Sequence, residues 1–149
     1  MNIFIVTRDP SITTPTQAHK GDAGIDLRYE GGAFLGLAPG ETGLFPTGLS
    51  FELPPTTVGM ICPRSGLALK SQITVANAPG IVDSSYRGEV MVILHNFGHL
   101  PFTIDPKMRI AQFLIVSLAR GTPRYDLVIA DALSHTDRGA DGFGSTGDE

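Results

Sequence analysis

Short β-prone runs, each ended by glycine or proline, recur along most of the chain and limit the folds open to it. The sequence has 18 glycines and 11 prolines, and the turn pairs between runs include Gly31-Gly32, Pro39-Gly40 and Asp105-Pro106. No long stretch shows the periodicity of an amphipathic helix. The pattern predicts an all-β fold, built from many short strands that are joined by tight turns.

Length and charge narrow the class of protein. A chain of 149 residues suits one domain, which we place at residues 1–133, followed by a tail at 134–149. The formal net charge of −4 argues against an extended nucleic-acid or acidic-membrane surface. No apolar run approaches the ~18 residues that a membrane span needs. The chain is thus expected to bind neither nucleic acid nor membrane.

The single cysteine, Cys62, excludes an intrachain disulfide, so a cytoplasmic location is the simpler expectation. Because Cys62 lies in the apolar run Val58–Cys62 with no candidate base nearby in sequence, it is expected to be a core thiol.

An alternating segment places one carboxylate away from the core. In Asp22–Arg28, Ile25 and Leu27 alternate with Asp26 and Arg28, which is typical of a half-buried strand. If the two apolar residues face the core, Asp26 faces a surface or an interface.

The succession of short β-prone runs is interrupted at Pro63–Lys70. Helix-forming residues follow Ser65, a strong N-cap residue, and predict one or two helical turns that begin there. Backbone N–H groups beside Arg64 would suit a phosphate. A capped short helix with a surface arginine explains the segment equally well.

The segment Asn77–Val90 lies between the β-prone runs Ile73–Val75 and Val90–Leu94 and indicates a β-hairpin arm with a polar tip. Asp83 and Tyr86 stand near that tip, where a rigid hairpin could present a reactive site. An ordinary solvated turn is the alternative. The run Val90–Leu94 does not alternate, which predicts a strand buried on both faces.

Two further polar features stand out against their surroundings. Gln112 lies in the longest strand candidate, Arg109–Leu118, where its amide should have a partner, either a ligand or an edge-strand group. Arg124–Ile129 is expected to close the ordered part. In the glycine-rich tail, Phe143 stands alone near Ser145 and Thr146, so the tail could wrap phosphates and stack on a base, or simply be disordered.

Common nucleotide and metal motifs are missing from the sequence. It has no phosphate-binding P-loop pattern, no G-x-G-x-x-G after a strand and no H-E-x-x-H. With one cysteine and no His/Cys/Glu set at ligand spacing, no transition-metal site built only from protein groups is expected.

Five blocks stand in one order along the chain: AGIDL (23–27), PRSGLALK (63–70), NAPGIVDSSYRGE (77–89), RIAQ (109–112) and RGADGFGSTG (138–147). Together they resemble the trimeric, all-β deoxyuridine triphosphatase (dUTPase) family, from about residue 19 to the C-terminus. Three positions depart from the family pattern. Val82 replaces the usual Ile, Ser84-Ser85 replace common acidic residues, and Lys107-Met108 replace the usual Gly-Asp. None of these departures removes a reacting group.

The resemblance implies a distorted jelly-roll-like β-barrel with one short helix and a flexible glycine-rich C-terminal arm. It also implies hydrolysis of dUTP to dUMP and pyrophosphate with Mg²⁺, which supplies dUMP and keeps uracil out of DNA. Asp83 matches the family's catalytic carboxylate, which activates a water for in-line attack on the α-phosphorus.

The same resemblance implies roles for further residues. The phosphate-binding positions are Arg64, Ser65, Gly66 and Gln112. The uracil and sugar positions are Asn77, Ile81, Val82, Asp83, Tyr86 and Met91. The tail positions are Arg138, Phe143, Gly144, Ser145 and Thr146. Because magnesium keeps waters and binds through substrate phosphates, no direct protein ligand is expected, and Asp26 would act through a metal-bound water or a structural bond.

In this family three subunits build each site: blocks one, two and four come from one, the hairpin from a second, the tail from a third. A homotrimer is therefore implied. A dCTP deaminase or a bifunctional relative is the alternative within the fold, although Asn77 and Tyr86-Arg87-Gly88 favour dUTP hydrolysis. A nucleotide-gated interaction protein is the alternative of another class.

Overall fold

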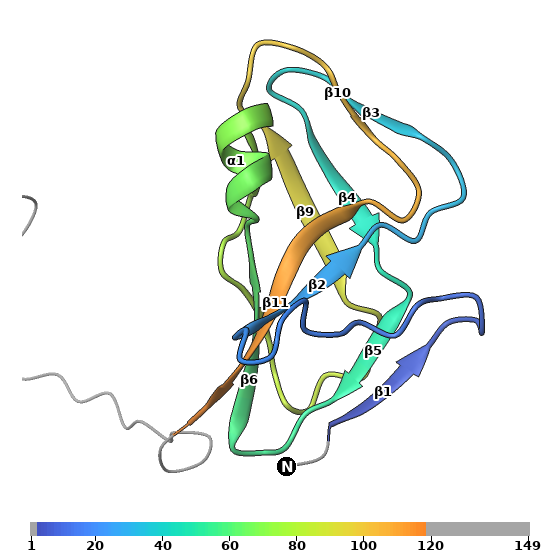
Figure 1. Cartoon of the computed structure of the whole chain (residues 1–149), viewed down its shortest axis with the longest axis vertical. Helices are drawn as coiled ribbons and strands as arrows, with labels where there is room; N and C mark the ends of the chain where they lie inside the picture. The colour runs from blue at the N-terminus through green and yellow to red at the C-terminus, as the bar shows by residue number, and fades with distance from the viewer. Residues whose placement is uncertain (1–2, 119–149) are drawn as a thin grey trace, which may run out of the picture.

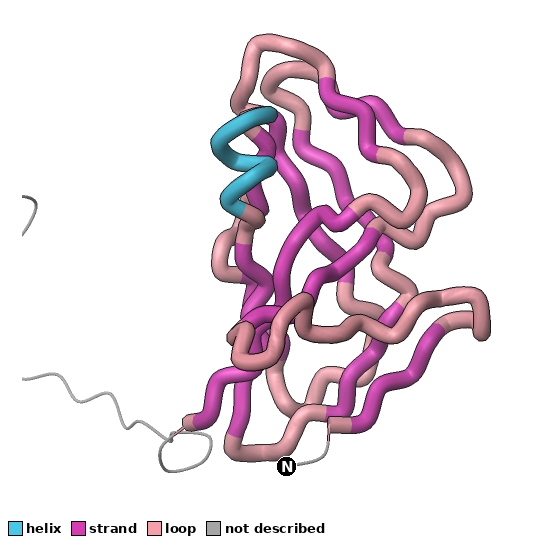
Figure 2. The backbone as a smooth tube through the Cα atoms, in the orientation of Figure 1, coloured by secondary structure: helices cyan, strands magenta, loops and turns pink. Residues whose placement is uncertain are grey.

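The computed structural model describes residues 3–118, which form antiparallel strands and one short helix (Figures 1 and 2). The strands are β1 (Phe4–Thr7), β2 (Gly24–Arg28), β3 (Leu35–Leu37), β4 (Thr42–Pro46), β5 (Leu49–Glu52), β6 (Thr57–Cys62), β7 (Ile73–Val75), β8 (Gly80–Val82), β9 (Met91–Asn96), β10 (Phe102–Ile104) and β11 (Arg109–Ser117). The helix α1 covers Ser65–Ser71. The predicted strand Arg124–Ile129 lies outside the described residues.

Strands that pair in the sheets are often distant in sequence. The largest sheet has the order β2-β11-β6-β8, so the last described strand lies between two much earlier ones (Figure 1). A three-stranded sheet has the order β4-β9-β7, and β1-β5 and β10-β3 form two smaller pairs. The prediction of an all-β, jelly-roll-like fold with one short helix is confirmed for the described residues.

Aromatic rings fill the space between the sheets. Phe51 stacks on Phe113 with ring centroids 4.7 Å apart, and Tyr29 meets Phe45 edge to face at 5.7 Å. Gly59 explains the gap in the apolar run of β6, because a Cβ atom there would lie 2.3 Å from the Phe113 ring. The glycine therefore lets the central sheet accept a large ring at its middle.

The turn before β11 has an unusual backbone. Lys107 has a φ of 66°, a left-handed conformation that favours glycine and that a lysine adopts at a steric cost. Its Nζ forms an ion pair with Glu30, whose side chain is only 4% exposed. The side chain thus provides a contact that glycine, the usual residue of the family at this position, would lack.

Two local expectations were wrong. Arg64 rather than Ser65 is the N-cap of α1, and its side chain makes no capping hydrogen bond, so Ser65 is the first helical residue. Residues 90–94 are not buried on both faces. Val92 and Leu94 are buried, whereas Met91 and Ile93 are half-buried, because the strand belongs to a sheet with one face toward the core.

The predicted hairpin is correct at its base only. Strands β7 and β9 pair, with Val75 opposite Leu94, but β8 between them pairs with β6 of the other sheet. The tip at Asp83 is therefore fixed to two sheets and does not project as a free arm.

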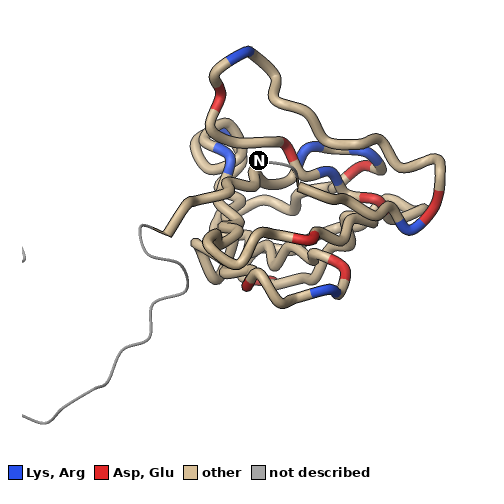
Figure 3. Tube along the Cα trace, turned by 90° about the horizontal axis from the view of Figure 1, so that it is seen from below, with Lys and Arg blue, Asp and Glu red and all other residues tan. Residues whose placement is uncertain are grey.

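In the described part of the chain, the helix is too short and too polar to cross a membrane. Positive and negative residues are interspersed along the chain (Figure 3). Any concentration of positive charge is therefore local, as at Asp26, which two arginines contact.

Candidate functional site

A row of three side chains crosses the central sheet. Asp26 on β2 lies opposite Gln112 on β11, which in turn lies opposite Cys62 on β6. Because residues directly opposite in a sheet project from the same face, the row forms one surface. It lines a pocket of about 500 Å³ whose other walls include Arg64, Ser65, Gly66 and Arg109.

The carboxylate of Asp26 holds two guanidinium groups. Its Oδ1 lies 3.0 Å from Nε of Arg64, and its Oδ2 lies 3.2 Å from Nη1 of Arg109. Arg64 also donates from Nη1 to the carbonyl of Arg109 at 3.2 Å. Around Asp26 two positive groups meet one negative group, so this part of the pocket is cationic, although Asp22 also lines the pocket. Both arginines keep N–H groups for an anion.

The amide of Gln112 has a backbone partner. Its Nε2 donates to the carbonyl of Pro63 at 2.8 Å, which ties β11 to the segment before α1. A Cβ atom on Gly24 would lie 2.9 Å from Oε1 of Gln112, so the glycine of the AGIDL block leaves room for the amide. The prediction that Gln112 finds a partner is confirmed, and the partner is the carbonyl of Pro63, shortly before α1.

Sequence reasoning missed Arg109 and misplaced Cys62. Arg109 is the first residue of the RIAQ block, but only the pairing of β2 with β11 brings it beside Asp26. Cys62 is not a core thiol: it is half-buried and lines the pocket, because β6 alternates and its odd positions face inward. The run Val58–Cys62 is apolar throughout, so its sequence carries no alternation that could have placed the thiol.

The remaining predicted residues of the described part line a second pocket, of about 240 Å³. They are Asn77, Ile81, Val82, Asp83, Tyr86 and Met91.

A turn shapes the tip beside this pocket. The backbone N–H of Tyr86 donates to the carbonyl of Asp83 at 3.0 Å, and the Tyr86 hydroxyl donates to the carbonyl of Glu89 at 3.0 Å. Gly88 is required under the ring, since a Cβ atom there would lie 2.4 Å from the Tyr86 hydroxyl. Asp83 is exposed and Tyr86 is 46% exposed, so both groups remain accessible.

Strand β6 separates the two pockets. It pairs with β11, which carries Gln112, along one edge, and with β8, which leads to Asp83, along the other. The structure thus divides the predicted set into a phosphate-type group and a base-type group. The tail residues Arg138, Phe143, Gly144, Ser145 and Thr146 lie outside the described residues.

No cluster of three or more His, Cys, Asp or Glu side chains that could hold a metal occurs among residues 3–118. Asp26 and Asp22 are the acidic residues of the cationic pocket, and both oxygens of Asp26 already contact arginine. A carboxylate has about four lone-pair sites, so each oxygen can still accept from a water.

The fold and the two pockets define a class: an all-β protein with one arginine-lined pocket and a second pocket that presents a carboxylate. A family model described as dUTPase matches residues 10–147. The chain therefore belongs to the dUTPase family. This confirms the family and the enzyme class expected from the five sequence blocks.

Curated relatives named deoxyuridine 5'-triphosphate nucleotidohydrolase match nearly the full chain. The relative from Rhizobium etli is 50% identical and the match covers 99% of this chain and 93% of the relative. The relative from Clostridioides difficile is 47% identical, with 98% of each chain covered.

Solved structures share the fold. A mutant dUTPase of Staphylococcus bacteriophage 80alpha with dUpNHpp has a TM-score of 0.83 and 24% identity, and the match covers 98% of each chain. A mutant dUTPase of phage phi11, described with a structural Mg(II) ion, has a TM-score of 0.76 and 20% identity, and covers 88% of this chain and 99% of its own.

Proposed function

We propose that the chain hydrolyses dUTP to dUMP and pyrophosphate at a site that different subunits of a homotrimer complete together. The observation that carries this proposal is the division of the site residues by β6 into two pockets. One pocket is suited to phosphates and holds Arg64, Arg109 and Gln112, whereas the other presents Asp83 and Tyr86. Each chain carries one pocket of each kind. Each site would combine the phosphate-type pocket of one chain with the Asp83 pocket of a neighbouring copy.

The cationic pocket would hold the phosphate chain. Arg64 is oriented before substrate arrives, because Asp26 and the Arg109 carbonyl fix its guanidinium. Ser65 and Gly66 are exposed in the first turn of α1, where backbone N–H groups have no intrahelical partner. Groups fixed in advance stabilise developing charge without reorganising during the reaction.

The second pocket would select the base and the sugar. The Asn77 amide and the backbone of Ile81–Asp83 would offer hydrogen bonds to the uracil edge, and Met91 would close the apolar side. Tyr86 is held by its bond to Glu89, so its ring has a fixed position against which deoxyribose can pack. A ring fixed there leaves no room for a 2′-hydroxyl.

Asp83 would act as the general base. Its carboxylate accepts a proton from a water, the water oxygen bonds to the α-phosphorus, and the bond from that phosphorus to the bridging oxygen breaks. Pyrophosphate leaves in line with the attack. A positioned base contributes about 10²–10⁴-fold, and the cationic pocket must supply most of the remainder.

Magnesium, when bound with the triphosphate, would neutralise part of the phosphate charge. The described residues fit an ion that the substrate phosphates hold, since Asp26 can accept from a metal-bound water while it keeps both arginines. The tail residues Arg138, Phe143, Gly144, Ser145 and Thr146 would complete the site from a third subunit, with Phe143 on the uracil.

Release of pyrophosphate from dUTP, dCTP, dTTP and UTP tests the proposal. We expect a strong preference for dUTP, together with loss of activity when magnesium is chelated. Equal rates with the four nucleotides would contradict dUTP hydrolysis. Uridine products from dCTP would instead indicate a deaminase.

A further inference from the structure

Two arginines oppose each other across the central sheet. Arg28 on β2 and Arg109 on β11 are direct partners in the ladder. Like charges directly opposite in a sheet are destabilising. Asp26 compensates Arg109 but also contacts Arg64, so two guanidinium groups share one carboxylate.

Arg28 has no acidic partner among residues 3–118. Its Nη1 donates to the carbonyl of Lys107 at 2.9 Å, which contributes no negative charge. Each of the other arginines in residues 3–118 forms an ion pair with a carboxylate. Arg28 is half-buried, so its charge is less screened than that of an exposed side chain.

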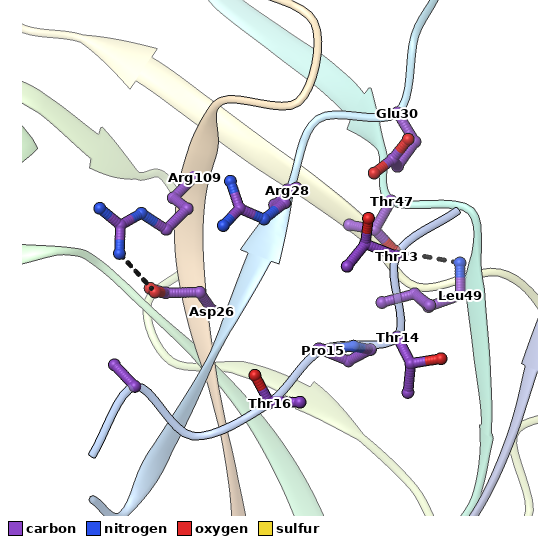
Figure 4. Close-up of a pocket in the computed structure, with 11 residues that line it drawn as sticks. Thr13, Thr14, Pro15, Thr16, Asp26, Arg28, Glu30, Thr47, Leu49 and Arg109 are labelled. Carbon is purple, nitrogen blue, oxygen red and sulfur yellow. Dashed lines mark hydrogen bonds and ion pairs between the residues drawn. The ribbon is translucent and has the colours of Figure 1, made fainter. Parts of the chain in front are cut away.

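A polar cavity of about 120 Å³ lies beside this arginine pair (Figure 4). Arg28 and Arg109 form one wall, and the threonines of the loop before β2 form another: Thr13, Thr14 and Thr16. No side-chain hydrogen bond involves these three hydroxyls within the described part of the chain. The volume corresponds to about four water molecules at liquid density.

The acidic residues of the cavity wall are already compensated. Glu30 is paired with Lys107, and Asp26 with Arg64 and Arg109. Arg28 is the positive side chain of the cavity wall that no carboxylate contacts within residues 3–118.

We propose that this cavity is a second anion site, which binds a tetrahedral oxyanion of the phosphate or sulfate class between the two arginines and the threonine hydroxyls. Guanidinium groups donate two hydrogen bonds to such an anion, and hydroxyls supply further donors. The site is distinct from the phosphate-type pocket, which Arg28 does not line, although Asp26 and Arg109 belong to both. It depends on neither Asp83 nor the proposed reaction.

Thermal unfolding of the full chain in phosphate or sulfate, with chloride at equal ionic strength as reference, tests the site. A ligand that binds only the folded state stabilises it, and at about ten times Kd we expect a rise in Tm of about 3–6 °C. Arg28→Gln should lose this rise. Thr13→Val, Thr14→Val and Thr16→Val combined should reduce it without changing the charge. Arg87→Gln, which removes an exposed guanidinium at the hairpin tip, should keep it.

The same titration with saturating dUpNHpp separates the two anion sites. The phosphate effect should persist, since the nucleotide would occupy the other pocket. The proposal is overturned if phosphate acts no more strongly than chloride, if the nucleotide abolishes the effect, or if Arg28→Gln retains it.

Discussion

Asp26 lies directly opposite Gln112 in the β2–β11 ladder, and both side chains project into the pocket that Arg64 and Arg109 line. The carboxylate fixes the arginines, and the amide fixes the backbone at Pro63. The two residues therefore place cationic groups on a rigid sheet before any ligand binds.

We expect Asp26→Asn to separate turnover from anion affinity. Without the ion pairs Arg64 loses its orientation, and kcat should fall by about tenfold. One negative charge also disappears, so pyrophosphate should inhibit more strongly. Steady-state rates with added pyrophosphate measure both effects. An unchanged kcat would mean that Asp26 does not position the arginines.

Asp83→Asn should lower kcat by about 10²–10⁴-fold, because the amide cannot take the proton of the attacking water. Binding of dUpNHpp, measured by calorimetry, should change little. Asp105→Asn, at an exposed turn before β11, is the matched control and should behave as wild type. Loss of nucleotide binding in Asp83→Asn would indicate instead that Asp83 holds the hairpin tip together.

A mixture of two inactive chains should regain activity if the site is shared. Asp83→Asn chains supply an intact cationic pocket, and Arg64→Ala chains supply an intact hairpin. After unfolding and refolding together in equal amounts, about one quarter of the sites in a closed trimer should combine two intact halves. No recovery in trimers shown to contain both chains would place each site within a single chain.

Gly24→Ala should impair the site while the fold persists. The new Cβ atom would lie 2.9 Å from Oε1 of Gln112 and displace the amide from Pro63. A displacement of this size can reduce kcat/KM by about 10- to 100-fold. Gly36→Ala on β3, where a Cβ atom would meet nothing within 4 Å, controls for the loss of a strand glycine. Equal activity of the two variants would contradict the crowding argument.

Lys107→Gly restores the residue usual in the family but should destabilise this chain. It relieves the left-handed backbone, yet it leaves the nearly buried Glu30 without its ion pair. We expect a net loss of about 1–3 kcal/mol in the free energy of unfolding. Glu30→Gln added to Lys107→Gly should restore part of the loss in urea denaturation. A single variant more stable than wild type would show that backbone strain dominates.

Local patterns predicted the strands more accurately than the contacts between them. Ile73–Val75 has the bounds expected from sequence, because β-prone residues and flanking turns determine them. The outward direction of Asp26 followed from alternation alone. The pairing of β8 with β6 could not be predicted in this way, since it joins segments of two different sheets.

The five sequence blocks identified the chemical groups of the site but not the residues that contact them. Ser65 is a preferred N-cap residue, but Arg64 takes the N-cap position and Ser65 is the first helical residue. Arg109 and Arg28 became neighbours only through a ladder between the second and the last described strand. The cavity that Arg28 and Arg109 line could therefore not be predicted from the residues of a single sequence block.

The position of β6 between the two pockets has a consequence for mixtures of intact and defective chains. Cys62 pairs with Gln112, and the adjacent Ile61 pairs with Gly80, so a distortion of this one strand shifts both pockets of its chain. In the proposed assembly those pockets belong to different reaction centres. A defective copy would then disable two centres at once, and activity would fall faster than the fraction of intact chains.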